Sequence, residues 1–416
     1  MSEVKKKKIL LLSDHMLSVS GVGTQSRHLI EGLVKKGNWT VRQLGAAIKH
    51  ANYETVVVNA DIIIKPIDGF GDKNLLRFLL AQEKPDVVMI FTDPRFFLWL
   101  FEMEDEIHQV CPIVWWHVWD NRPTPLFNNA LYEATDLLNC HSYLTYEMCK
   151  ENFPNKTNFV PHGIPESIFY KMKPEEIETY KQMVLGDKKN HFTGIWVNRN
   201  AKRKRSNDVI VSWSLFLNEL EQKHGHRNAN LIMHTDPHDQ EGPNLIYTAS
   251  QLGVTDNILF SRDRIGFDKM NVLYNISDFC INISYAEGFG LSTLESMQTG
   301  TPIIALKTGG MTRQVVDHRD NSENGIALPV EFTSYVGSQQ VPSIAEDYVS
   351  NETVAKKLME MYEMGSEKRL ALGEKARRYA ESEFNLQNTV DTWDKTLSET
   401  IENWRGRYAR YEQFDI

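Results

Sequence analysis

The segment from Asp278 to Gly310 constrains the fold of this chain more than any other stretch. It reads DFCINISYAEGFGLSTLESMQTGTPIIALKTGG, in which the apolar run Phe279–Ser284 predicts a buried strand. The run LSTLESMQ predicts a helix that closes at Gly300, because glycine adopts the left-handed cap conformation easily. Thr301–Leu306 predicts a second strand. Together they predict one βαβ unit, whose helix N-terminus offers backbone N–H groups to an anion at the carboxyl end of a sheet.

Two carboxylates frame the glycine-rich turn of this unit. Glu287 follows the first strand and Glu295 lies inside the helix. If the amides at the helix start hold a diphosphate, Glu295 faces a ribose diol and Glu287 lies beside the group on the distal phosphate. The amides in question are those of Gly290, Leu291, Ser292 and Thr293. The alternative is two solvated acids near a helix start, where the dipole favours negative charge.

The motif EGFGLSTLE followed by TGTPIIALKTGG resembles the nucleotide-sugar site of the retaining glycosyltransferases of family 4. This resemblance implies the GT-B fold, an α/β architecture of two Rossmann-like, doubly wound domains that face a central cleft. It also implies a nucleotide-sugar donor that is bound mostly by the C-terminal domain. A final helix, predicted from Trp393 to Arg410, would cross back to the N-terminal domain.

Length and composition agree with this organisation. A chain of 416 residues suits two domains. With the roles that the resemblance implies, we place the acceptor-side domain at 1–168, the nucleotide-sugar-binding domain at 169–390 and the C-terminal helix segment at 391–416. A net charge of −9 argues against wholesale binding to nucleic acid or anionic membranes, and leaves a local basic groove possible. No apolar run reaches the length of about 18 residues that a membrane-spanning helix needs. The basic residues at the start lead into a short predicted strand, Ile9–Ser13. The four cysteines have no metal-ligand spacing, and we expect a cytoplasmic protein.

Two features of the first half carry functional expectations. The turn SVSGVGT follows the first strand and precedes a helix predicted over Thr24–Lys36. By spacing alone this segment is an ordinary tight turn. It also resembles the family's glycine-rich loop, which approaches the donor phosphates, and this resemblance assigns Gly21 and Gly23 to donor binding. In PIVWWHVWDNRP, His117 ends a predicted strand, where the family carries a histidine near the donor sugar. The alternative is a satisfied core histidine, and the small residues usual after it are replaced here by Val118 and Trp119.

The second half opens with a predicted strand, Phe192–Val197, and the basic run NRNAKRKR. An arginine and a lysine at a strand's carboxyl end can neutralise a leaving diphosphate, and the family has this pair at about the spacing of Arg199 and Lys204. A solvated basic loop is the alternative, and three neighbours compete for the role: Lys202, Arg203 and Arg205. In the loop SRDRIG, Arg264 is expected near the nucleotide base. No Asp-x-Asp triplet occurs, so we expect neither a metal nor a cofactor.

The sequence therefore predicts a retaining, metal-independent glycosyltransferase. Front-side attack, with the leaving phosphate taking the acceptor's proton, is the expected mechanism. Three alternatives stay open: a phage-type glycosyltransferase acting on a hydroxylated DNA base, a nucleotide-sugar epimerase of the same fold, and a non-catalytic binding protein. The acceptor stays open as well, as a glycan, a small molecule, a protein or a modified base.

Overall fold

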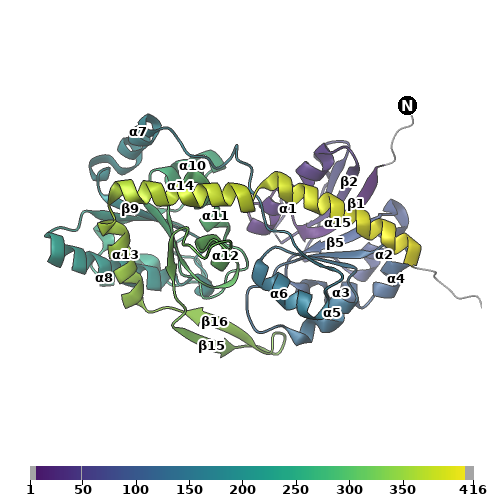
Figure 1. Ribbon diagram of the computed structural model, residues 1–416. Coiled ribbons are helices and arrows are strands. Elements are labelled where there is room, and N and C mark those ends of the chain that lie inside the picture. The colour runs from purple at the N-terminus through teal and green to yellow at the C-terminus, as the bar shows by residue number, and fades with distance from the viewer. Residues whose placement is uncertain (1–5, 48, 408–416) are drawn as a thin grey trace, which may run out of the picture. The chain divides into compact units, whose positions relative to one another are not determined.

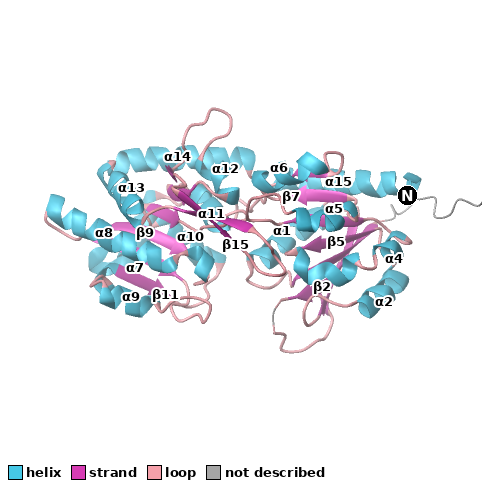
Figure 2. Ribbon diagram, turned by 90° about the horizontal axis from the view of Figure 1, so that it is seen from below, coloured by secondary structure: helices cyan, strands magenta, loops and turns pink. Residues whose placement is uncertain are grey.

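The computed structural model describes residues 6–47 and 49–407, which form two compact units (Figure 1). Unit 1 holds the described residues up to Gly163, Gly337–Ser343 and those from Phe384 on, and unit 2 holds Ile164–Val336 and Ile344–Glu383. In each unit helices flank a parallel sheet (Figure 2). These are the two parallel α/β sheets that the sequence predicts.

Unit 1 contains an eight-stranded sheet in the order β3-β4-β2-β1-β5-β6-β7-β8. All neighbours pair in parallel except β3 and β4. Its strands are β1 Lys7–Asp14, β2 Trp39–Ala46, β3 Val56–Val57, β4 Ile62–Pro66, β5 Val87–Phe91, β6 Ile113–His117, β7 Leu137–Cys140 and β8 Thr157–Phe159. Its α-helices are α1 Gly21–Lys35, α2 Lys73–Glu83, α3 Leu98–Phe101, α4 Glu104–His108, α5 Asn129–Glu133, α6 Tyr143–Asn152 and α15 Leu386–Arg407.

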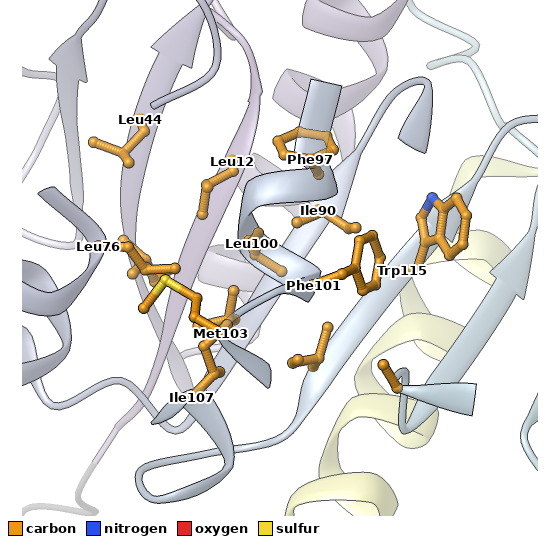
Figure 3. Close-up of a cluster of buried hydrophobic side chains, with 14 of the residues drawn as sticks. Leu12, Leu44, Leu76, Ile90, Phe97, Leu100, Phe101, Met103, Ile107 and Trp115 are labelled. Carbon is orange, nitrogen blue, oxygen red and sulfur yellow. The ribbon is translucent and has the colours of Figure 1, made fainter. Parts of the chain in front are cut away.

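Both faces of this sheet are buried, because successive side chains of a strand point to opposite faces. Along β1, Leu10 and Leu12 belong to one apolar cluster and Ile9 and Leu11 to another. Figure 3 shows the first cluster, in which side chains of the sheet meet those of helices α2 to α4. The near-continuous apolar run of β1 is thus the consequence of helices on both faces.

The last helix, α15, packs on unit 1 and covers the second cluster. Its Trp393 ring lies 5.2 Å from that of Trp116, and Asp394 accepts a 2.7 Å hydrogen bond from the Trp39 indole. The prediction of a final helix that returns to the N-terminal domain is therefore confirmed. It begins earlier than predicted, at Leu386, and residues 408–416 of the predicted segment lie outside the described residues.

Unit 2 contains a six-stranded, all-parallel sheet in the order β11-β10-β9-β12-β13-β14. Its strands are β9 Phe192–Val197, β10 Ala229–His234, β11 Ile258–Ser261, β12 Phe279–Asn282, β13 Ile303–Leu306 and β14 Ile326–Leu328. Its α-helices are α7 Pro174–Leu185, α8 Ser206–His224, α9 Leu245–Gln251, α10 Phe267–Asn275, α11 Leu291–Thr299, α12 Thr312–Val315, α13 Asn351–Glu363 and α14 Gly365–Glu383. The βαβ unit predicted from the sequence is β12, α11 and β13, and Gly300 caps α11 with a φ of 76°.

Unit 2 also carries an antiparallel hairpin that the sequence analysis did not predict. Its strands are β15 Phe332–Val336 and β16 Ile344–Tyr348, and they pair only with each other among the described strands. None of the described helices combines the length and the apolar content that crossing a membrane would require.

Candidate functional site

The turn between β12 and α11 has the backbone geometry of an anion site. Gly290 is the N-cap of α11 with a φ of 91°, a conformation that glycine adopts at low cost. A Cβ there would lie 2.6 Å from Thr293 Oγ1 and 2.9 Å from Met311 Cγ. The first intrahelical bond runs from Leu294 N to Gly290 O, so the amides of Leu291, Ser292 and Thr293 precede it. That these amides and that of Gly290 hold a diphosphate stays a prediction.

A buried glutamine holds this turn in place. Gln314 has no exposed surface, receives a hydrogen bond from the Thr293 hydroxyl and donates one of 2.8 Å to Phe289 O. Beside it, the Gly310 amide donates to Glu287 O at 3.0 Å, and a Cβ on Gly310 would lie 2.4 Å from Phe289 Cα. Sequence reasoning missed Gln314, because its role arises from packing of α12 against the turn, which no local pattern records.

Lys204 and Glu287 form a buried ion pair at this turn. Their side chains are 9% and 11% exposed, and Arg203 Nη1 lies 3.8 Å from the same carboxylate. Burial alone would raise the pKa of Glu287, but Lys204 and Arg203 outweigh it, and the pKa lies below its usual value. Glu287 is thus an ionised acceptor beside two cations, at the start of a helix.

The other basic residues of the run lie elsewhere. The Arg199 side chain is 60% exposed and pairs with Asp239 at 2.7 Å and Glu241 at 3.1 Å. Arg205 bonds Asp208 and the Val349 carbonyl, and Lys202 is exposed. Of the residues that compete for the diphosphate, the structure brings Lys204 and Arg203 to Glu287. Arg264 is exposed in the loop after β11.

Glu295 lies on the second turn of α11, and the hydroxyl of Tyr274 donates to it at 2.6 Å. Burial raises the pKa of Glu295 to about 7, although the hydrogen bond from Tyr274 acts in the opposite direction. Tyr274 itself has no exposed surface and comes from α10. No local pattern in the sequence indicates this partner, since the pair forms only when α10 packs against α11.

In unit 1, Gly21 and Gly23 lie in the first turn of α1, which begins three residues earlier than the predicted helix. The Ser20 hydroxyl caps this helix by accepting a 2.9 Å bond from the Gly23 amide. A Cβ on Gly23 would lie 2.3 Å from Ser18 Oγ and 2.6 Å from the His15 carbonyl. Close packing under the turn therefore requires a glycine at position 23.

His117 is the last residue of β6 and has no exposed surface. Its Nε2 lies 2.9 Å from the Tyr132 hydroxyl, and its ring centroid lies 4.1 Å from that of Trp115. The structure thus encloses the side chain within unit 1, and a role towards a sugar or an acceptor stays a prediction. Among the described residues, no group of three or more histidine, cysteine, aspartate or glutamate side chains is arranged to hold a metal ion.

The sequence of this chain is similar to those of known glycosyltransferases. Residues 184–379 match the family model described as Glycosyl transferases group 1. The chain is 41% identical over 73 residues to D-inositol 3-phosphate glycosyltransferase of Salinispora arenicola, covering 18% of this chain and 16% of that protein. It is 23% identical over 277 residues to N-acetyl-alpha-D-glucosaminyl L-malate synthase of Bacillus anthracis, covering 65% and 62%. The matches therefore span less than two thirds of these relatives' own lengths.

One solved structure shows the likeness of the fold. The crystal structure of Anabaena HepE in complex with UDP matches with a TM-score of 0.69 and 14% identity, over 95% of this chain and all of that one. The match covers nearly the whole of both chains, so this chain and HepE share the two-sheet architecture over nearly their full length.

Proposed function

This chain belongs to the glycosyl transferases group 1 family, and we propose that it transfers a sugar from a nucleotide diphosphate sugar to an acceptor hydroxyl with retention of configuration. The observation that carries the proposal is the buried Lys204–Glu287 ion pair at the N-terminus of α11. It places two cations, Lys204 and Arg203, beside a helix start, where the backbone amides and the positive charges together favour an anionic ligand. The proposed ligand is a diphosphate linked to a sugar.

Each part of the donor has a matching group in unit 2. The amides of Leu291 to Thr293 and the ammonium of Lys204 suit a diphosphate, because both favour negative charge. One turn further along α11, the Glu295 carboxylate suits the two hydroxyls of a ribose. Glu287 suits the hydroxyls of the transferred sugar, because Lys204 and Arg203 keep it ionised and therefore an acceptor only.

The proposed reaction is a front-side displacement. The bond between the sugar's anomeric carbon and the diphosphate oxygen breaks, and the acceptor oxygen bonds to the same face of that carbon. The acceptor's proton passes to the departing phosphate oxygen. Lys204 and the helix amides stabilise the charge that develops on the diphosphate, which is the largest contribution expected from fixed groups.

Uridine diphosphate is the first nucleotide to test, since HepE, which shares the fold, was solved with UDP. The experiment is a thermal-shift and donor-hydrolysis screen against UDP-, GDP-, ADP- and TDP-sugars, with Glu295→Ala beside the wild type. We expect one nucleotide to stabilise the wild type and Glu295→Ala to abolish the shift. The absence of a shift with every nucleotide would refute the proposal in favour of a binding protein of the same fold.

A further inference from the structure

Arg205 has a backbone conformation that L-amino acids seldom adopt. It joins the short 3₁₀ helix Lys202–Lys204 to α8, and its φ of 53° and ψ of 39° lie in the left-handed region. This conformation brings Cβ close to the following carbonyl oxygen, so it suits glycine best. Among the described residues of unit 2, one other non-glycine residue has a positive φ, and it is Asn321, of a type that tolerates this region. Strain at Arg205, beside the candidate site, therefore calls for a functional explanation.

The side chain of Arg205 makes the contacts that offset this strain. Its Nε donates to Asp208 Oδ2 at 2.9 Å, and its Nη2 donates to the Val349 carbonyl at 3.0 Å. The guanidinium carbon lies 5.3 Å from the centroid of the Tyr348 ring, within the range of a cation–π contact. The side chain is only 7% exposed, and hydrogen bonds from a charged donor are stronger than neutral ones. The left-handed conformation is thus held by a buried, charged side chain.

The two residues before Arg205 contact the turn between β12 and α11. The Tyr285 amide donates to the Arg203 carbonyl at 3.2 Å, and the Lys204 side chain pairs with Glu287. Lys204 immediately precedes the left-handed residue, and α8 immediately follows it. The φ and ψ of Arg205 therefore set the direction in which Lys204 leaves the start of α8. A change in these two angles would move the Lys204 ammonium relative to Glu287.

We propose that Arg205 is a positioning residue, whose left-handed backbone, held by its buried guanidinium, directs Lys204 to the diphosphate. This inference rests on the proposed transferase function and deepens it, because it separates Arg205 from the basic residues that compete for the diphosphate. The Nη1 atom of Arg205 is buried and has no hydrogen-bond partner among the described residues. A direct bond from Nη1 to a phosphate is therefore the competing explanation that the experiment has to separate.

Two substitutions separate the backbone of Arg205 from its guanidinium. Arg205→Gly removes the guanidinium and adopts the left-handed conformation without strain, whereas Arg205→Ala removes the same group and keeps a Cβ in that conformation. Lys84 provides the matched control, because this exposed residue at the C-cap of α2 in unit 1 is also left-handed, with a φ of 47°. It is replaced by glycine and by alanine in the same way.

The full-length wild type and the four variants are titrated calorimetrically with UDP, GDP, ADP and TDP, below the lowest of their measured melting temperatures. We expect Arg205→Ala to weaken binding of the preferred nucleoside diphosphate about tenfold, since the strain of a left-handed L-residue is of that size and no contact offsets it. Arg205→Gly should stay within about threefold of the wild type. Lys84→Gly should melt above Lys84→Ala, and both should bind the nucleotide as the wild type does.

Equal losses of affinity in Arg205→Gly and Arg205→Ala would overturn the proposal and assign a direct phosphate contact to the guanidinium. Unchanged affinity in both variants would overturn it as well, and would leave Arg205 with a role in stability alone. A wild type that binds none of the four nucleotides would refute the transferase function, and this inference with it. Failure of the proposed function is thus told apart from failure of the role proposed for Arg205.

Discussion

The two units share an architecture and differ in the chemistry at the carboxyl ends of their strands. In unit 2 these ends carry the Lys204–Glu287 pair and, nearby, a carboxylate with a pKa of about 7. In unit 1 they carry aromatic rings and histidines such as His117, which is enclosed beside Tyr132. Burial holds the pKa of His162 well below its usual value, so this histidine is neutral near pH 7.

If the donor binds unit 2 as proposed, the fold alone does not decide which sheet receives a charged ligand. In each sheet, loops follow the carboxyl ends of the strands, and ligands of open α/β sheets bind at these ends. Among the described residues, only those of unit 2 join a buried cation to a helix start whose N-cap is a left-handed glycine. The chemistry therefore depends on a few side chains placed on a common scaffold.

The largest effect is expected from Lys204→Met. It leaves the Glu287 carboxylate buried without its main partner, which should lower the free energy of unfolding by about 3 kcal/mol. Sugar transfer should fall by roughly two to three orders of magnitude, since the charge on the diphosphate loses its cation. Denaturant unfolding and steady-state rates measure the two effects.

The control for this prediction lies in unit 1. Lys36 pairs with Asp391 and Asp394, and its side chain is 28% exposed. Lys36→Met should therefore cost less than about 1 kcal/mol and leave transfer intact. A double variant, Lys204→Met with Glu287→Leu, should regain stability and remain inactive. Equal stability losses for Lys36→Met and Lys204→Met would contradict the contrast between the units.

The next largest effect is expected at the glycine turns, which we compare through Gly290 of unit 2 and Gly23 of unit 1. Gly290→Ala places a side chain at a φ of 91° and should cost about 2 kcal/mol. It should also weaken nucleotide binding at least tenfold, because the amides of α11 shift. Gly23→Ala crowds Ser18 and His15 and should weaken nucleotide binding less, in line with the loop's resemblance to one that approaches the donor phosphates.

Gly32→Ala is the matched variant for the unit 1 turn. It lies in the same helix, and its added Cβ would meet Val390 at 2.5 Å, away from the turn. It should destabilise the protein without changing nucleotide affinity, as measured by calorimetric titration. If Gly23→Ala and Gly32→Ala leave the affinity equally unchanged, the unit 1 turn has no part in donor binding.

A smaller effect is expected from Tyr274→Phe. The proposed ribose contact requires Glu295 as a carboxylate, so donor affinity should rise with pH through about 7, the pKa of this group. The Tyr274 hydroxyl lowers that pKa, and its removal should move the midpoint up by about one pH unit. The donor KM across pH 5.5 to 9 measures the shift. Tyr379→Phe, which removes another buried hydroxyl of unit 2, should leave the midpoint in place.

The sequence could predict elements whose signals are local. The apolar run of β12, the glycines of the next turn and Gly300 sufficed for the βαβ unit. The Tyr274–Glu295 and Gln314–Thr293 contacts join separate helices, and no local pattern encodes such packing. The hairpin had only a weak signal: FTSYV is rich in β-branched and aromatic residues and a turn with glycine and proline follows it, but neither FTSYV nor IAEDY alternates between apolar and polar residues.

The smallest effect on stability is expected from Arg199→Ala. This variant tests whether the spacing of Arg199 and Lys204 in the sequence identifies the residues that bind the diphosphate. In the structure Arg199 pairs with Asp239 and Glu241 at the surface, and such pairs contribute less than about 1 kcal/mol. A diphosphate offers a bidentate, charge-assisted partner that competes well with these exposed carboxylates. Arg199→Ala should therefore leave unfolding unchanged and weaken nucleotide diphosphate binding about tenfold. Arg203→Ala tests the competing residue, since the Arg203 side chain already lies beside Glu287 in the structure. A loss of affinity in Arg203→Ala alone would assign the diphosphate to Arg203, and would show that spacing identified the loop but not the residue.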